Sequence, residues 1–199
     1  GILAAGSATA APLRIVASFY PIYISTLNVA KGIPDVEVVS LTPPVTGCLH
    51  DYSLTPQDLK TLTDANVFVI NGLGMESFLR DVEKRAPYAR IVNASKGIAP
   101  IDGNPHVWVS VSLAIQQVRN IANALEEVDP EHADFYRRNA DAYIVRLDAL
   151  RKKMLAGLKD VKNRNIVTLH EAFPYFAREF GLRVVAVVER EPGSEPSAR

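Results

Sequence analysis

The chain has 199 residues, of which 48% are hydrophobic and 22% charged, and its 22 basic side chains balance 22 acidic ones. Zero formal charge argues against a sequence-independent nucleic-acid binder, which needs surplus lysine and arginine to displace phosphate counterions. No apolar run reaches the roughly 20 residues that span a bilayer. The composition is that of a globular protein of one or two domains.

Residues 1–12 are mostly small and apolar and precede the first predicted strand. The triplet Ala8-Thr9-Ala10 fits a signal-peptidase site, so we interpret this segment as the remnant of a secretory signal. A disordered leader is the alternative. This interpretation predicts a periplasmic or cell-surface protein, either soluble or membrane-anchored.

Residues 13–128 alternate between β-branched runs and amphipathic stretches, which predicts an α/β lobe with parallel strands and crossover helices. Threonine or proline at the first turn marks two helix starts, near Pro21 and Thr55. The expected strands are 13–18, 36–41, 67–71 and 90–93, and the expected helices are 21–31, one from 56 onward, 76–85 and 111–128.

Residues 129–162 carry apolar side chains at spacings of three and four, which predicts one long connecting helix of about 45 Å. A coiled-coil arm is the alternative. Residues 163–199 then supply a strand (165–169), a helix (171–180) and a strand (182–188). The expected fold is therefore two parallel-sheet α/β lobes joined by a long backbone helix.

The unit formed by residues 163–199 is too small for a core of its own, so we interpret it as the start of an incomplete second lobe. An incomplete sheet exposes an unpaired strand edge and an uncovered apolar face. We therefore expect this part of the chain to be poorly ordered, or to pack against a second copy or a separate C-terminal fragment.

Three of the four histidines follow predicted strands. His50 lies after the second strand, His106 lies just beyond the fourth, and His170 ends the fifth. Parallel α/β folds bind ligands at such strand ends, and three imidazoles with one further ligand suit tetrahedral zinc. The spacing is a weak signal, because no HExxH or CxxC pattern is present. The fourth histidine, His132, is interpreted as a solvated surface residue.

Five segments resemble the zinc and manganese receptors of bacterial ABC transporters, the lipoprotein-adhesin-like metal-binding proteins. They are 14–21 (RIVASFYP), 50–58 (HDYSLTPQD), 71–76 (NGLGME), 104–108 (NPHVW) and 170–176 (HEAFPYF). These segments occur in the family's order and spacing. The resemblance implies that His50, His106 and His170 bind the metal and that an ABC transporter permease receives it.

The third ligand position is histidine in zinc receptors of this family and often glutamate in manganese receptors, so His170 favours zinc. Residues 94–105 lack the histidine-rich loop of many zinc receptors, which leaves manganese or ferrous iron open. The resemblance places the fourth ligand, commonly aspartate, beyond this chain. We interpret Cys48 as a loop residue, with auxiliary zinc ligation as the alternative. Asp51 and Glu171 are candidates to orient the imidazoles.

Two other classes of function remain as alternatives. A zinc-dependent hydrolase would need an open coordination position and a general base beside the metal. The sequence offers only Asp51 and Glu171 next to the histidines and no further catalytic pattern, so a receptor without enzymatic activity is expected. A host-binding surface adhesin is the second alternative, and no motif in the sequence addresses it.

Overall fold

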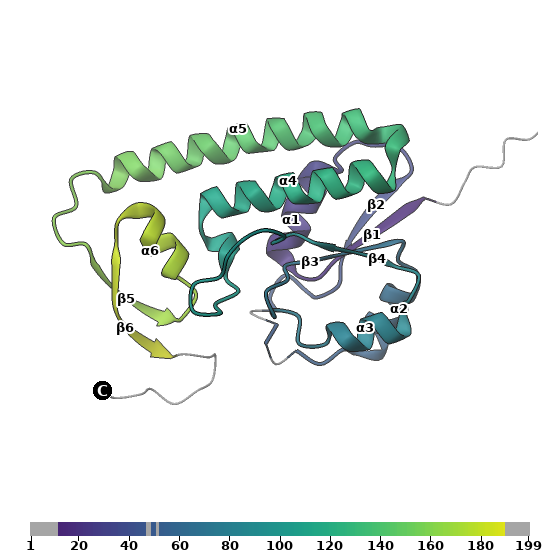
Figure 1. Ribbon diagram of the computed structural model, residues 1–199, viewed down its shortest axis with the longest axis horizontal. Helices are drawn as coiled ribbons and strands as arrows, with labels where there is room; N and C mark the ends of the chain where they lie inside the picture. The colour runs from purple at the N-terminus through teal and green to yellow at the C-terminus, as the bar shows by residue number, and fades with distance from the viewer. Residues whose placement is uncertain (1–11, 47–48, 51, 190–199) are drawn as a thin grey trace, which may run out of the picture.

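The computed structural model describes residues 12–46, 49–50 and 52–189, which form two α/β parts beneath one long helix (Figure 1). The predicted fold class is confirmed. The first part contains β1 (Leu13–Ala17), α1 (Tyr20–Val29), β2 (Val36–Ser40), α2 (Pro56–Thr63), β3 (Val67–Ile70), α3 (Leu79–Arg85) and β4 (Arg90–Asn93).

The strands of the first part form one sheet in the order β2-β1-β3-β4, and all three pairings are parallel. Ile15 in β1 lies opposite Val38 on one side and Val67 on the other. Every residue of β3 is buried, as expected for a parallel strand covered on both faces. The four predicted strands are thus confirmed, each within one residue at either end.

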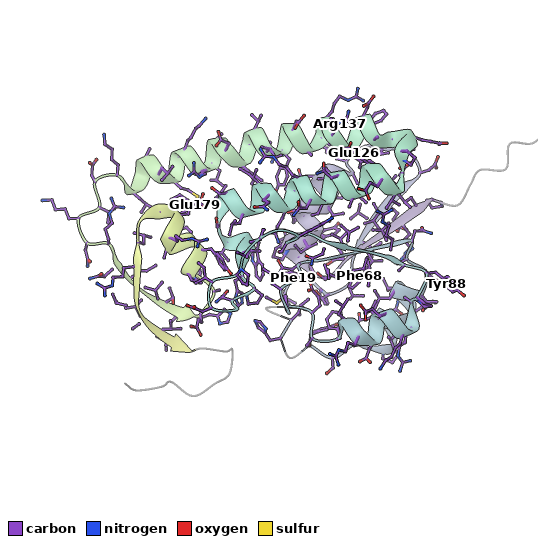
Figure 2. All side chains as sticks on the ribbon, in the orientation of Figure 1. Phe19, Phe68, Tyr88, Glu126, Arg137 and Glu179 are labelled. Carbon is purple, nitrogen blue, oxygen red and sulfur yellow. The ribbon has the colours of Figure 1, made fainter. Side chains whose placement is uncertain are left out.

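Helices cover both faces of this sheet. Figure 1 shows α1 and α4 (Val111–Val128) on one side and α2 and α3 on the other. The main core lies between these layers and includes Phe19 and Phe68, both almost fully buried (Figure 2). Because the helices cover the faces of the sheet, the carboxyl ends of the strands stay uncovered at one edge, where the chain can present ligand groups.

The predicted helix 76–85 begins three residues late, at Leu79. Glu76 is buried in the loop before it, where its carboxylate accepts hydrogen bonds from Ser18 Oγ at 2.8 Å and from the backbone N–H groups of Asn71 and Gly72 at 2.7 and 3.0 Å. Burial raises the pKa of Glu76 even though these hydrogen bonds oppose it. The Glu76 carboxylate thus stabilises the loop between β3 and α3, and the regular helix begins three residues after it.

Helix α2 begins with the expected threonine cap. Thr55 Oγ1 accepts from the backbone N–H of Asp58 at 3.2 Å, and the Asp58 carboxylate accepts from the backbone N–H of Thr55 at 2.8 Å. This reciprocal pair is a capping box.

We expect Thr55→Ala to lower the free energy of unfolding by about 1 kcal/mol, measured by urea denaturation, because the substitution removes the cap. Thr63→Ala, at the exposed end of the same helix, should change it far less.

The predicted continuous helix 129–162 is interrupted at its start. A short 3-10 turn, η2 (Pro130–His132), precedes α5, and the regular helix extends only over Ala133–Leu158. The Asp129 carboxylate caps this corner by accepting from Tyr136 Oη and His132 Nδ1, both at 2.8 Å. His132, expected to be solvated, is so only in part, since its side chain is 26% exposed and hydrogen-bonds to Asp129.

Helix α5 runs antiparallel to α4 and extends past it toward the second part of the chain (Figure 1). Tyr136 and Ala140 on its apolar stripe are buried in the main core, and Tyr143 and Leu147 pack against that core. The stripe is therefore used within the chain, which confirms the connecting helix and not a coiled-coil arm. No helix in the described residues is long and apolar enough to cross a membrane.

The second part consists of β5 (Asn165–His170), α6 (Pro174–Phe180) and β6 (Arg183–Glu189). The two strands pair in parallel, and Phe180 at the end of α6 packs in a small cluster with Val111 and Ile115 of α4. Val167 and Leu169 of β5 are 63% and 76% exposed. One face of this two-stranded sheet is thus apolar and open in the described residues.

Candidate metal centre

His106 lies in the loop between β4 and α4 and is 3% exposed. Asn104 Oδ1 is 2.9 Å from the backbone nitrogen of His106 and 2.8 Å from its ring Nδ1. Because a backbone N–H can only donate, this contact identifies the Asn104 atom as the accepting oxygen, and Nδ1 then carries the imidazole proton. Nε2 is consequently the nitrogen with the lone pair, which is the form that coordinates a metal.

His170, at the end of β5, meets His106 from the second part of the chain. The two Nε2 atoms are 3.1 Å apart, and the ring planes are inclined by 84°. Two nitrogen ligands of one tetrahedral zinc, each at about 2.05 Å, lie about 3.3 Å apart. The separation of this pair is therefore close to that of two ligands of a single ion.

His50 lies beside His106, with 5.3 Å between their ring centroids. All three strand-end histidines predicted from the sequence are thus neighbours, with His106 in the middle. Among the described residues, no group of three or more histidine, cysteine or acidic side chains is arranged to hold a metal ion. The structure therefore shows two adjoining pairs of imidazoles, and their joint ligation of one ion stays a prediction.

The electrostatics of His106 favour metal binding. Burial, reinforced by the proximity of His170 and His50, lowers the pKa of His106 from 6.5 to about 4. The ring is therefore neutral at physiological pH and need not release a proton before it binds a cation.

A cavity of about 570 Å³ adjoins the histidines, with walls from both parts of the chain. Asp102 and Asn104 line it on one side, and Thr168, Glu171 and Val187 line it on the other. This volume far exceeds that of one ion. Because its walls come from both parts, the cavity lies between them, next to the histidines that follow the strands.

Asn104 also bridges the two parts of the chain, a role that its place in the NPHVW motif does not reveal. Its Nδ2 donates to the main-chain carbonyl of Glu171 at 2.6 Å, directly beside His170. Tyr175 Oη donates to the Asn104 carbonyl and accepts from the Ile101 backbone N–H at 2.9 Å. The sequence marked these residues only as members of motifs, and their contacts depend on packing between distant segments.

Two of the other candidate residues, Cys48 and Asp51, lie outside the described residues. Glu171 lines the cavity, and the hydrogen bond that it makes to the site uses its main-chain carbonyl. Trp108 packs edge-on against Phe19, and its ring centroid is 5.2 Å from that of His106. The tryptophan of the NPHVW motif therefore packs beside the buried histidine.

Comparison with known proteins finds zinc-uptake and zinc-binding relatives. The chain is 33% identical over 210 residues to the high-affinity zinc uptake system protein ZnuA of Bacillus subtilis, covering 94% of this chain and 64% of that protein. It is 30% identical to the zinc-binding protein AdcA of Streptococcus pyogenes, of which it covers 42%. The chain thus spans less than two thirds of the length of these relatives.

Solved structures share the fold. The Zn(II)-bound ZnuA-like domain of Streptococcus pneumoniae AdcA superposes with a TM-score of 0.82 at 32% identity, covering 94% of this chain and 71% of that one. The solute-binding protein FpvC of Pseudomonas aeruginosa with Ni²⁺ gives 0.82 at 36% identity, covering 94% and 70%. The same protein has also been solved with Mn²⁺.

The match to the family extends over residues 15–199, almost the whole chain, and includes all three strand-end histidines. The family predicted from the five short motifs is therefore confirmed. This chain belongs to the ZnuA family, the periplasmic component A of zinc-uptake complexes.

Proposed function

We propose that this protein is an extracytoplasmic zinc receptor that captures the ion between its two parts and delivers it to an ABC transporter permease. One observation carries the proposal: a buried, neutral His106 points its Nε2 at that of His170, 3.1 Å away. Relatives at 30–33% identity are zinc-uptake and zinc-binding proteins, which agrees with this geometry.

We assign His50, His106 and His170 as the protein's metal ligands. Three neutral imidazoles form a borderline nitrogen donor set, which suits zinc better than manganese because manganese prefers carboxylate and water. A manganese or ferrous-iron receptor is the second candidate, since a similar solved protein holds Mn²⁺ and Ni²⁺ in different crystals. The fourth position would be filled by water or by a carboxylate from outside the described residues.

The proposed role is binding and release without chemical turnover. The relatives named above are uptake and binding proteins. A transport receptor must bind the ion and later release it to the permease, and it does not need a reactive metal-bound water. Neither a hydrolase nor an adhesin is suggested by these comparisons. The receptor would work outside the cytoplasm, in solution or tethered, as a similar zinc-binding protein of Streptococcus pneumoniae is a lipoprotein.

We further propose that the open apolar face of β5 and β6 is covered in the working receptor by the remainder of a second lobe. The relatives are longer than this chain, and a sheet of two strands leaves Leu169 and Val185 more than half exposed. A second copy or a separate C-terminal fragment would cover the same face. In this scheme residues 13–128 form one lobe, 129–162 the connecting helix, and 163–199 the start of the other.

Elemental analysis of the protein as purified, paired with its intact mass, tests the choice of metal. We expect zinc in an amount close to one equivalent, removable by a chelator and restored by added zinc. Manganese or iron at one equivalent, with zinc unable to displace it, would favour the second candidate. Failure to bind any of the three metals would contradict the receptor proposal.

A further inference from the structure

Helix α6 is attached to the first part of the chain at both of its ends. Tyr175, in its first turn, is 1% exposed and hydrogen-bonds to the backbone of Ile101 and Asn104 beside the histidines. Glu179, in its last turn, makes a second set of contacts on the side of α6 toward α4 and α5 (Figure 2). Two attachments hold a short helix in orientation as well as in position.

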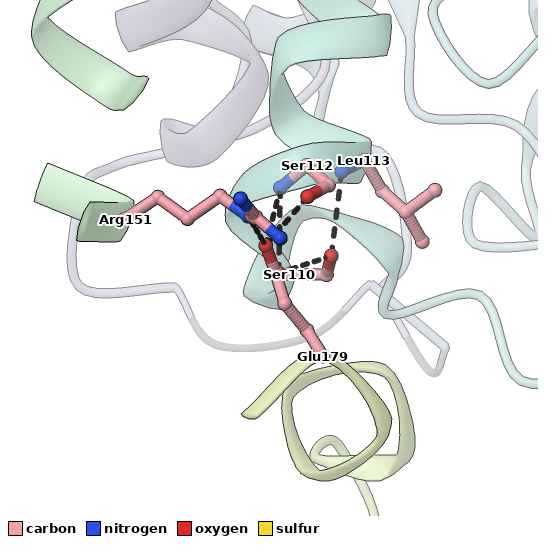
Figure 3. Close-up of polar contacts among 5 residues, drawn as sticks. All are labelled: Ser110, Ser112, Leu113, Arg151 and Glu179. Carbon is pink, nitrogen blue, oxygen red and sulfur yellow. Dashed lines mark hydrogen bonds and ion pairs between the residues drawn. The ribbon is translucent and has the colours of Figure 1, made fainter. Parts of the chain in front are cut away.

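The second attachment is a buried carboxylate surrounded by donors from two other helices (Figure 3). Glu179, whose side chain is 5% exposed, accepts from Ser110 Oγ, Ser112 Oγ and Arg151 Nε, each at 2.6 Å. The backbone N–H of Ser112 also points at it, at 3.1 Å. Because Ser110 and Ser112 start α4 and Arg151 belongs to α5, one side chain joins α6 to both long helices.

The charge of Glu179 suits this position. Burial acts to raise the pKa of its carboxyl, but the hydrogen bonds from Ser110, Ser112 and Arg151 outweigh that effect and hold the pKa below its ordinary value. The first turn of α4 contains no acidic residue of its own. A carboxylate from α6 therefore complements the positive end of the helix dipole as well as the guanidinium.

These contacts connect the two segments that carry the close imidazole pair. Ser110 follows His106 by only four residues, and Glu179, in the last turn of α6, follows His170 by nine. The carboxylate does not line the cavity beside the histidines. Any influence of Glu179 on a bound ion must therefore act through the placement of β5 and α6 relative to the loop of His106.

We propose that Glu179 is a positioning residue that holds His170 against His106 before a metal arrives. The inference rests on the proposed function, in which both histidines are ligands. Without this attachment, the second part of the chain would sample orientations that separate the two Nε2 atoms. Apparent affinity falls in proportion to the fraction of molecules in the binding-competent arrangement.

The test is Glu179→Gln in the intact protein, because glutamine keeps the shape of the side chain and removes the charge that faces Arg151 and the α4 terminus. We expect zinc to bind about 10-fold more weakly, as it would if only about a tenth of the molecules kept the binding-competent arrangement. Competition with a chelator of known affinity measures the change. In the metal-free protein, the nuclear Overhauser contact between the rings of His106 and His170 should weaken or disappear.

Asp129→Asn is the matched control. Asp129 is also a largely buried carboxylate that accepts two side-chain hydrogen bonds, but its partners Tyr136 and His132 lie within the α4–α5 corner. This variant should lower the melting temperature yet leave zinc affinity and the ring contact unchanged. Equal loss of zinc affinity in Glu179→Gln and Asp129→Asn would show that the loss comes from lower overall stability, and would overturn the inference.

Wild type and His106→Ala in the same titration separate this inference from the proposed function. If wild type binds zinc tightly, His106→Ala does not, and Glu179→Gln binds as wild type with its ring contact intact, then the positioning role is wrong and the receptor stands. If His106→Ala binds as wild type, the ligand assignment fails and the positioning role fails with it.

Discussion

His106→Ala is expected to raise the dissociation constant for zinc by more than about 100-fold, because loss of an outer partner of a ligand already costs 10- to 100-fold. His106 is the central histidine, next to both His170 and His50, so its removal breaks both imidazole pairs at once. Titration calorimetry, with a chelator in competition where binding is tight, measures the change directly.

His132→Ala is the control for this prediction. His132 is also partly buried and hydrogen-bonded, but it lies at the corner before α5 and contacts Asp129. Its loss should lower the stability of that corner and leave zinc affinity within a factor of about two of wild type. Equal damage by the two substitutions would show that the affinity follows general stability and not ligation, and would refute the site.

Metal-free protein is expected to lose stability on mild acidification, by about 3 kcal/mol between pH 6.5 and pH 4. The pKa of His106 is about 4 in the folded protein against 6.5 for an ordinary histidine. Between these values the unfolded chain binds a proton that the folded chain excludes, so falling pH favours unfolding. The contribution is fully present above pH 6.5 and is lost as the pH falls through 4.

Urea denaturation of the metal-free protein at several pH values between 4 and 7 measures this loss. His106→Gln, which cannot titrate, should show a decline smaller by about the same 3 kcal/mol over the interval. Zinc should protect the wild type at pH 7, since an ion bound only to the folded form adds its binding free energy to stability. An identical pH dependence for wild type and His106→Gln would contradict the assignment of a buried, neutral imidazole.

Much of this molecule follows from local sequence signals. The β-branched runs at residues 13–18 and 67–71 predict strands that the structure confirms almost residue for residue, because such side chains suit a pleated, covered surface. The Thr55 cap is equally local, since donor and acceptor are three residues apart. Alternation of strand and helix then implies parallel pairing, and so places His50, His106 and His170 at strand ends.

Where sequence-based prediction was wrong, a side chain had a partner that local pattern does not show. Helix α3 begins at Leu79 and not at residue 76, and Glu76 lies in the loop before it with its carboxylate bonded to N–H groups of that loop. His132 was expected in solvent and is 26% exposed, but it also hydrogen-bonds to Asp129 at the corner between α4 and α5. The sequence pattern does not show either hydrogen bond.

Local signals were enough to predict most of the elements, the parallel sense of strand pairing and three candidate histidines, because alternation and motifs are evident in short stretches of sequence. The strand order and the contacts around the histidines depend on packing between distant segments. The Nε2 atoms of His106 and His170, 3.1 Å apart, belong to residues separated by 64 positions in the sequence. Glu179 and its partner Ser110 at the start of α4 are separated by 69 positions. The lowered pKa of His106 likewise depends on burial by distant segments. Such properties arise only when separate parts of the chain exclude water from the same place.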